Sequence, residues 1–220
     1  GENRIVVKEG IKMLKTCNDV GINALIEQCN INKNEIDSYH FGFIIGPCLN
    51  ASGRLETAKI AIKLLEEQNK EVAKELAEKL RKLNEERKEM TENGTIKATE
   101  MAENSDNKVL VIYLKDCHES VAGIIAGRVR EKFNKPTIVL TDAEDGVKGS
   151  GRSIEEYNMY EELSRVREVF TKFGGHKMAA GLTIKRENLA AFTEAFNEAC
   201  SHFEEAIDQD ELWIDDVLRL

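Results

Sequence analysis

Residues 70–104 limit the fold more than any other part of the chain, because they combine nine acidic and eight basic side chains with no proline. Val72, Leu76, Leu80 and Leu83 recur there at intervals of three or four residues, which is the period of a helix. The pattern predicts one long helix, largely solvated, that joins two differently built regions.

Two charge pairs support this helix, since Glu75 with Lys79 and Glu78 with Lys82 are spaced four residues apart. A coiled coil is the alternative interpretation. The apolar stripe is short and contains no sustained heptad, which favours the single helix.

The region before this helix is expected to be built from short helices over residues 4–66. An apolar stretch, residues 41–45, leads into Gly46-Pro47, and this dipeptide is expected to end the element that precedes it. A further helix is expected from about residue 55 to residue 67.

The region after the long helix has an α/β pattern. Strands are expected at residues 108–114, 136–141, 146–153 and 178–184, helices at 119–133, 159–172 and 187–203, a turn at 174–176, and the start of a strand at 212–220. The first strand, helix and second strand suggest a parallel βαβ unit.

The net charge of -9 argues mildly against nucleic-acid binding, although a small basic groove can lie on an acidic protein. No apolar run approaches the ~18 residues of a membrane span, and the first residues lack the apolar core of a signal peptide. The five cysteines are scattered without CxxC spacing, which disfavours zinc or a disulfide framework and predicts a cytoplasmic protein.

Two glycine-rich motifs are candidate phosphate sites. In the first, Gly174 and Gly175 could offer backbone amides to an anion and His176 a hydrogen bond, or the segment could be a tight turn with an incidental histidine. The second is residues 149–153, where Ser150, Arg152 and Ser153 could clamp a phosphate or could end a solvated hairpin.

Two further segments are weaker candidates. Residues 50–54 are expected to precede a helix that Asn50 or Ser52 caps, and Arg54 could pair with a phosphate or with a structural carboxylate. His118 follows the first predicted strand, at the edge of a parallel sheet where ligands bind. Its neighbour Cys117 is not expected to act as a nucleophile, because adjacent side chains seldom point at a common target.

These motifs are candidates for binding phosphate, and they do not form a reaction centre. A metal phosphodiesterase needs Asp and His clustered around its ions, whereas the four histidines here are scattered and no DxD or DHH run is present. The chain is therefore expected to be inactive alone.

Together the motifs resemble the RecJ family of DHH phosphoesterases. The matching segments come in the family's order: GENR (1–4), GPCLNASGR (46–54), HESVAGIIAGRV (118–129), GSGRS (149–153) and GGHKMAAG (174–181). The resemblance implies an α/β fold with four parts: the helical end of a DHH domain (1–66), a long connecting helix (67–104), a DHH-associated domain with a central mixed sheet (105–203), and the start of a truncated OB-fold domain (204–220).

The resemblance also implies an activity, namely metal-dependent 5′→3′ degradation of single-stranded DNA, or of RNA, in repair and recombination. Mn or Mg would be bound by the full-length enzyme and not by this fragment. The residues implied to bind the nucleic-acid backbone are Asn50, Arg54, His118, Arg128, Ser150, Arg152, Ser153, Gly174, Gly175 and His176. Repair proteins are conceivable partners that the sequence does not identify.

Two positions depart from the family pattern, which has tryptophan where Cys117 stands and arginine where Cys48 stands. The first change weakens a stacking role and the second removes a basic group. The alternatives are a DHH-family oligoribonuclease, a cyclic-dinucleotide phosphodiesterase, or a non-catalytic tRNA-binding module.

Overall fold

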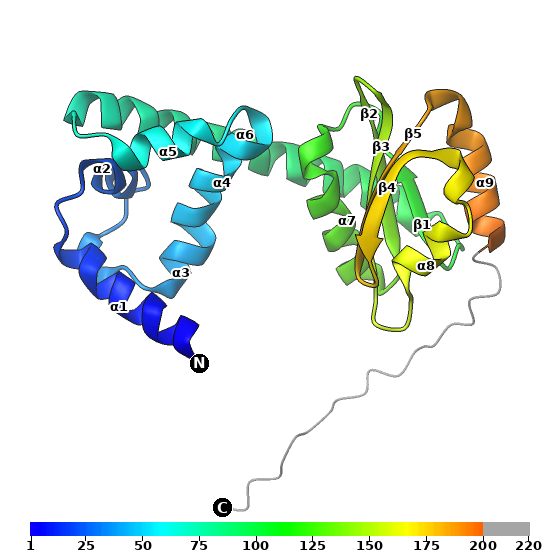
Figure 1. The fold of residues 1–220 in the computed structure, drawn as a ribbon, viewed down its shortest axis with the longest axis horizontal. Helices are drawn as coiled ribbons and strands as arrows, with labels where there is room; N and C mark the ends of the chain where they lie inside the picture. The colour runs from blue at the N-terminus through cyan, green and yellow to red at the C-terminus, as the bar shows by residue number, and fades with distance from the viewer. Residues whose placement is uncertain (200–220) are drawn as a thin grey trace, which may run out of the picture. The chain divides into compact units, whose positions relative to one another are not determined.

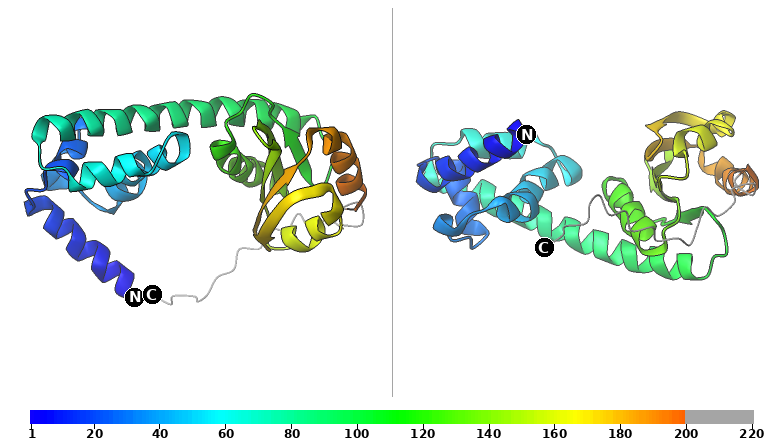
Figure 2. Two further views of the ribbon diagram at one scale, coloured as in Figure 1. Left: turned by 45° about the horizontal axis from the view of Figure 1, so that its top comes forward. Right: turned by 90° about the horizontal axis from the view of Figure 1, so that it is seen from below.

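The computed structural model describes residues 1–199, and the predicted strand at 212–220 lies outside them. The chain divides into two compact units, residues 1–96 and residues from 97 onward. The boundary falls within α6 (Lys70–Glu103), which is one continuous helix, as predicted (Figure 2). Lys82 pairs with Glu78 at 2.7 Å as expected, but Lys79 binds Glu56 at 2.6 Å instead of Glu75.

Unit 1 is built from helices packed around an apolar core. Its elements before α6 are α1 (Glu2–Thr16), α2 (Val20–Gln28), the 3₁₀ turn η1 (Lys33–Glu35), α3 (Ser38–His40), the π-helical turn η2 (Phe41–Ile45), α4 (Gly46–Leu55) and α5 (Lys59–Glu66). Leu25, Ile45, Leu64 and Leu80 are fully buried in the core. Helices α2 and α5 approach so closely that a Cβ on Gly21 would overlap the carbonyl group of Leu64.

The expected break at Gly46-Pro47 is wrong, because the chain stays helical from η2 into α4. Pro47 is the second residue of α4 and lies within this continuous helical path. The Gly46 N–H bonds to the carbonyl oxygen of Phe41, five residues back, in the π-helical manner. Residues 50–54 consequently lie inside α4 and do not cap a following helix, and the Ser52 hydroxyl donates to the Leu49 carbonyl at 2.9 Å.

Unit 2 contains a five-stranded mixed sheet in the order β1-β2-β3-β5-β4 (Figure 1). Its elements are β1 (Leu110–Tyr113), α7 (Glu119–Phe133), β2 (Thr137–Ala143), β3 (Gly146–Arg152), α8 (Met159–Ser164), η3 (Arg167–Val169), β4 (Phe170–His176), β5 (Ala179–Ile184), η4 (Arg186–Asn188) and α9 (Leu189–Ala199). Strands β1 and β2 are parallel, which confirms the predicted βαβ unit, and the other pairs are antiparallel. Helix α7 covers one face of the sheet, and α9 lies on the other side (Figure 1).

Strand β4 replaces two predicted elements, the end of the helix at 159–172 and the turn at 174–176. The error at the helix end has a physical cause. Phe170 and Phe173 are three residues apart, which is a helical spacing, but a bulge between Phe170 and Lys172 turns both rings toward the core.

A polar cluster fastens one end of this sheet. The Tyr113 hydroxyl donates to Asp142 at 2.5 Å, and Arg186 binds the other carboxylate oxygen at 2.7 Å. These two hydrogen bonds hold the pKa of Asp142 below its usual value. The cluster therefore joins β1, β2 and the chain after β5 by contacts that depend on an ionised Asp142.

Candidate nucleic-acid interface

Strand pairing brings the polar residues of β3, β5 and β4 to one face of the sheet. Residues directly opposite each other in an antiparallel pair point to the same side. The pairing therefore defines three rows, Arg152–Ala179–His176, Ser150–Gly181–Gly174 and Lys148–Thr183–Lys172. We call these nine residues the open face, because His176, Gly174, Gly181 and Lys172 are exposed.

Helix α7 borders the open face and fixes its central donors. A Cβ on Gly123 would lie 2.8 Å from Arg152 Nη2 and 2.8 Å from Ser150 Oγ, so both groups lie directly against this glycine. Arg152 Nη1 also donates to the Gly151 carbonyl at 2.8 Å and lies 3.4 Å from Ser150 Oγ. The absence of a side chain at residue 123 is what gives the guanidinium and the hydroxyl their places.

A cleft of about 330 Å³ opens between α7 and the open face. It is lined by Glu119, Ser120, Ala122, Thr141, Lys148, Gly149, Ser150, Gly181, Leu182 and Thr183. Lys148 binds Glu119 across it at 2.7 Å, and this contact raises the pKa of Lys148. The cleft is therefore lined by hydroxyl groups, by glycines and by one lysine that is paired with a carboxylate.

His118 caps the first turn of α7, at the end of the connection from β1. Its Nδ1 accepts the Ser120 N–H at 3.3 Å and lies 2.7 Å from Ser120 Oγ. His176 has a similar arrangement at the end of β4, where its Nδ1 accepts the Met178 N–H at 3.3 Å. In a neutral imidazole whose Nδ1 accepts, Nε2 carries the proton, so each ring keeps one further N–H to donate.

The predicted glycine nest is wrong, because Gly174 and Gly175 belong to a regular strand pair rather than a turn. Within residues 1–199, the glycine described with positive φ is Gly146. Gly174 lies on the open face with open space above it, whereas Gly175 faces the opposite side, 2.7 Å from the Ala180 Cα if a Cβ is added. Gly174 therefore leaves the open face flat, whereas Gly175 lets β4 pack closely against β5 on the opposite face.

Other predicted site residues do not belong to the rows that define the open face. Ser153 is buried and donates to the Tyr157 carbonyl at 2.6 Å, so its hydroxyl shapes a turn. Arg128 follows Gly123 by five residues, which places it about 140° around the helix at 3.6 residues per turn. Asn50 and Arg54 belong to α4 in unit 1, and their convergence with the open face stays a prediction.

Three functional candidates escaped the sequence interpretation, namely Gly123, Lys148 and Lys172. For one of them a signal was present, since Lys148, Ser150 and Arg152 alternate with small or apolar residues through the predicted strand. Lys172 was hidden by the bulge in β4, and the contact of Gly123 depends on how α7 packs on β3.

Within the described residues, no group of three or more His, Cys, Asp or Glu side chains could hold a metal ion. The donors in this described part of the chain therefore do not fit a catalytic metal. No helix in residues 1–199 is both long and apolar enough to cross a membrane.

Comparisons with known proteins show what this chain is similar to. Residues 106–202 match the family model of the DHHA1 domain. The chain is 37% identical over 201 residues to the single-stranded-DNA-specific exonuclease RecJ of Bacillus subtilis, which covers 90% of the chain and 26% of that relative. It is 35% identical over 231 residues to RecJ of Haemophilus influenzae, covering 99% of the chain and 40% of that protein.

Solved structures give the same result. The crystal structure of Thermus thermophilus RecJ with Mg²⁺ matches 93% of the chain at 28% identity with a TM-score of 0.81, over 32% of that structure's chain. An exonuclease RecJ bound to manganese matches with a TM-score of 0.82 over 51% of its chain. Residues 106–202 therefore match the DHHA1 domain, and the chain as a whole is similar to RecJ proteins, although it spans only about a quarter to two fifths of the curated sequences given above.

Proposed function

We propose that this chain is part of a single-stranded-DNA-specific 5′→3′ exonuclease of DNA repair and recombination, and that its open face holds the phosphate backbone. The observation that carries the proposal is that Lys148, Ser150 and Arg152 of β3 lie on the same face of the sheet. The exposed glycines Gly174 and Gly181 lie beside them on this face. Charged and hydroxyl donors bind phosphate oxygens, and a floor without side chains lets a strand approach the sheet. The names of the RecJ relatives support single-stranded DNA as the substrate.

Each donor has a defined role in this proposal. Arg152 offers a planar guanidinium to a phosphate, and Ser150 adds a hydroxyl donor next to it. His176 lies in the same row as Arg152, two strands away, so it would contact a neighbouring part of the backbone. Such contacts fix the position of the strand but carry no base information.

Hydrolysis, in this proposal, depends on residues of a longer protein. Thermus thermophilus RecJ was solved with Mg²⁺ and with Mn²⁺, whereas the described residues here include no metal-ligand cluster. We therefore expect the purified chain not to degrade single-stranded DNA with added Mn²⁺ or Mg²⁺. Degradation by a highly purified sample would contradict this part of the proposal.

The binding role is tested by comparing two arginine variants of this chain. Arg152→Ala should weaken binding to a 5′-phosphorylated single-stranded oligonucleotide by about 10- to 100-fold, since a charged hydrogen bond contributes about 1.5–3 kcal/mol. Arg128→Ala removes an equal positive charge from α7, on a side of this helix away from Gly123. It should change the affinity by less than about threefold, as expected for the loss of a charge without a specific hydrogen bond. Fluorescence anisotropy on several base sequences measures both.

Equal losses in the two variants would mean that general positive charge, rather than the open face, binds the strand. A loss at Arg152 that depends on base sequence would contradict backbone binding. The same titrations with RNA of equal sequence decide the preference between DNA and RNA. A cytoplasmic location remains a proposal, supported by cysteines that are all free in the described residues.

A further inference from the structure

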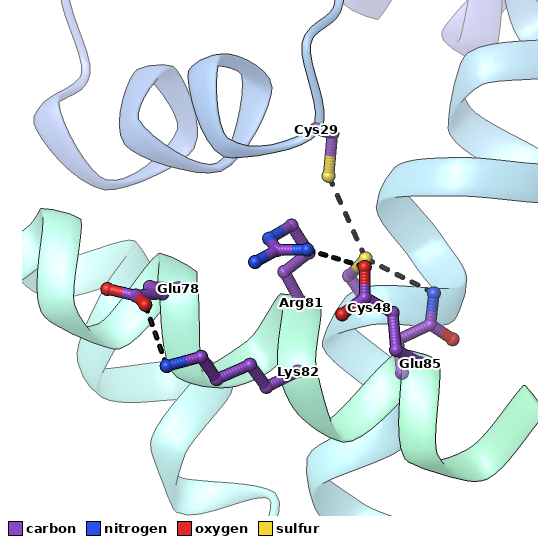
Figure 3. A network of polar contacts seen from close by, with 7 residues as sticks. Cys29, Cys48, Glu78, Arg81, Lys82 and Glu85 are labelled. Atoms are coloured by element: carbon purple, nitrogen blue, oxygen red, sulfur yellow. Dashed lines mark hydrogen bonds and ion pairs between the residues drawn. The ribbon is translucent and has the colours of Figure 1, made fainter. Parts of the chain in front are cut away.

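Two cysteines in unit 1 lie next to each other although they are 19 residues apart in the sequence. Cys29 follows α2 and Cys48 lies in α4, and their sulfur atoms are 3.8 Å apart (Figure 3). Cys48 is buried, at 2% exposure, whereas Cys29 is half-buried. The two thiols share a hydrogen bond, and a disulfide would bring the sulfur atoms from 3.8 Å to about 2.05 Å.

The surroundings favour an ionised Cys48. The buried side chain of Asn84 donates to Cys48 Sγ at 3.4 Å, and Arg87 binds the amide oxygen of Asn84 at 2.9 Å, which directs the amide nitrogen toward the sulfur. The hydrogen bond from Cys29 acts most strongly and, with Asn84 and the nearby charge of Lys88, lowers the pKa of Cys48 to about 7. The same hydrogen bond raises the pKa of Cys29, because Cys29 keeps the shared proton.

We propose that Cys29 and Cys48 are a site of reversible oxidation that forms a disulfide when the protein meets a peroxide. The Cys48 thiolate attacks one peroxide oxygen, the O–O bond breaks, and hydroxide leaves and takes up the thiol proton as water. The product is a sulfenic acid on Cys48. Cys29 then attacks that sulfur, the S–O bond breaks, and the Cys29 proton leaves with the hydroxyl group as a second water.

The burial of the pair fits this order of events. Cys29 is partly exposed whereas Cys48 is buried, so in this proposal a small peroxide reaches Cys48 from the side of Cys29. The attack by Cys29 is intramolecular over 3.8 Å, so it outruns a second peroxide and protects Cys48 from irreversible oxidation. The disulfide would tie the end of α2 to α4, two residues before Asn50.

Peptide mapping of the peroxide-treated chain tests the proposal. Cys17 and Cys29 share the tryptic peptide 16–33, so the Cys17→Ser variant gives an unambiguous link to the peptide 34–54 that contains Cys48. Hydrogen peroxide should remove two hydrogen atoms from the intact mass and join these two peptides. Fragmentation of the linked peptide from the unsubstituted chain gives the same assignment if the variant folds poorly.

Two comparisons show whether the geometry is responsible. The link should form at least about tenfold faster in the folded chain than in urea, because folding fixes the two sulfur atoms near each other. In Cys29→Ser, a cyclic 1,3-dione should trap the sulfenic acid on Cys48. Cys117 is the internal reference, since burial raises the pKa of its thiol and it should react more slowly.

Equal rates in folded and unfolded protein would overturn the proposal. So would a Cys48 that stays reduced while Cys17 or Cys117 is oxidised, or one that is oxidised to the sulfinic acid without forming the link. The outcome is independent of nucleic-acid binding, because no DNA is present in the experiment.

Discussion

Replacing Gly123 by alanine should lower the affinity for single-stranded DNA without lowering the stability of the fold. The new Cβ would lie 2.8 Å from both Arg152 Nη2 and Ser150 Oγ, whereas ordinary contact begins at 3.4 Å. Each group must therefore move by roughly 0.6 Å, the difference between these two distances. Both are the ends of side chains rather than backbone, so the fold can accommodate the shift while the proposed phosphate donors are displaced.

The two effects have opposite signs. Alanine in the interior of α7 should gain up to about 1 kcal/mol over glycine, which offsets the steric cost. The displaced guanidinium should weaken a hydrogen bond to phosphate, and because it moves rather than disappears, the loss should be near the lower limit of 1.5–3 kcal/mol, or about tenfold. Weaker binding with equal or higher stability is the expected combination.

Gly127→Ala is the matched control, since it lies one turn further along α7 and nothing lies within 4 Å of its added Cβ. It should gain the same helical stability and leave binding unchanged. Urea unfolding gives the stabilities, and anisotropy with a 5′-phosphorylated single-stranded oligonucleotide gives the affinities. Equal affinity in the two variants would refute the role given to the contact between Gly123 and Arg152.

Three further predictions concern the same unit. Glu119→Gln frees Lys148 and removes an anion from the cleft, so single-stranded DNA should bind more tightly at low salt and the gain should vanish at high salt, as anisotropy would show. Gly175→Ala should lower the unfolding free energy by about 1–3 kcal/mol in urea titrations, because its Cβ would collide with the neighbouring strand. Asp142 has a lowered pKa in the folded state, so it stabilises the fold above its usual pKa of 3.8 and loses this effect as pH falls. Asp142→Asn should therefore make the acid-side loss of stability shallower than in the unsubstituted chain, and an unchanged pH dependence would refute this.

How much the sequence could predict depended on whether a pattern was local. The long helix was predictable because its apolar period and its charges lie within one segment, and the βαβ unit because strand and helix alternate in order. Strand β4 was not, since its bulge imitates helical spacing and its glycines pair through backbone alone. The helical path through Gly46-Pro47 depends on a π-helical hydrogen bond that the residue types do not predict.

The same difference between local patterns and distant contacts applies to the site residues. Ser150 and Arg152 were identifiable from their strand, but Ser153 has the same chemistry and is buried in a turn, because the strand ends at Arg152. Which hydroxyl lies on the open face is decided by strand register, and register depends on pairing with distant residues.

An acidic chain can bind a polyanion if a few of its cations are concentrated at one site. On the open face both lysines already have carboxylate partners, Lys148 with Glu119 at 2.7 Å and Lys172 with Asp145 at 3.5 Å. A phosphate must therefore replace these carboxylates, and each exchange returns little net energy because exposed ion pairs are weak. We expect Arg152 to contribute through its geometry, because the contacts of its guanidinium with Gly123 and the Gly151 carbonyl orient it before the strand arrives. Because few phosphates are neutralised, binding should depend on salt only moderately, and its strength should come from the fixed geometry of the donors.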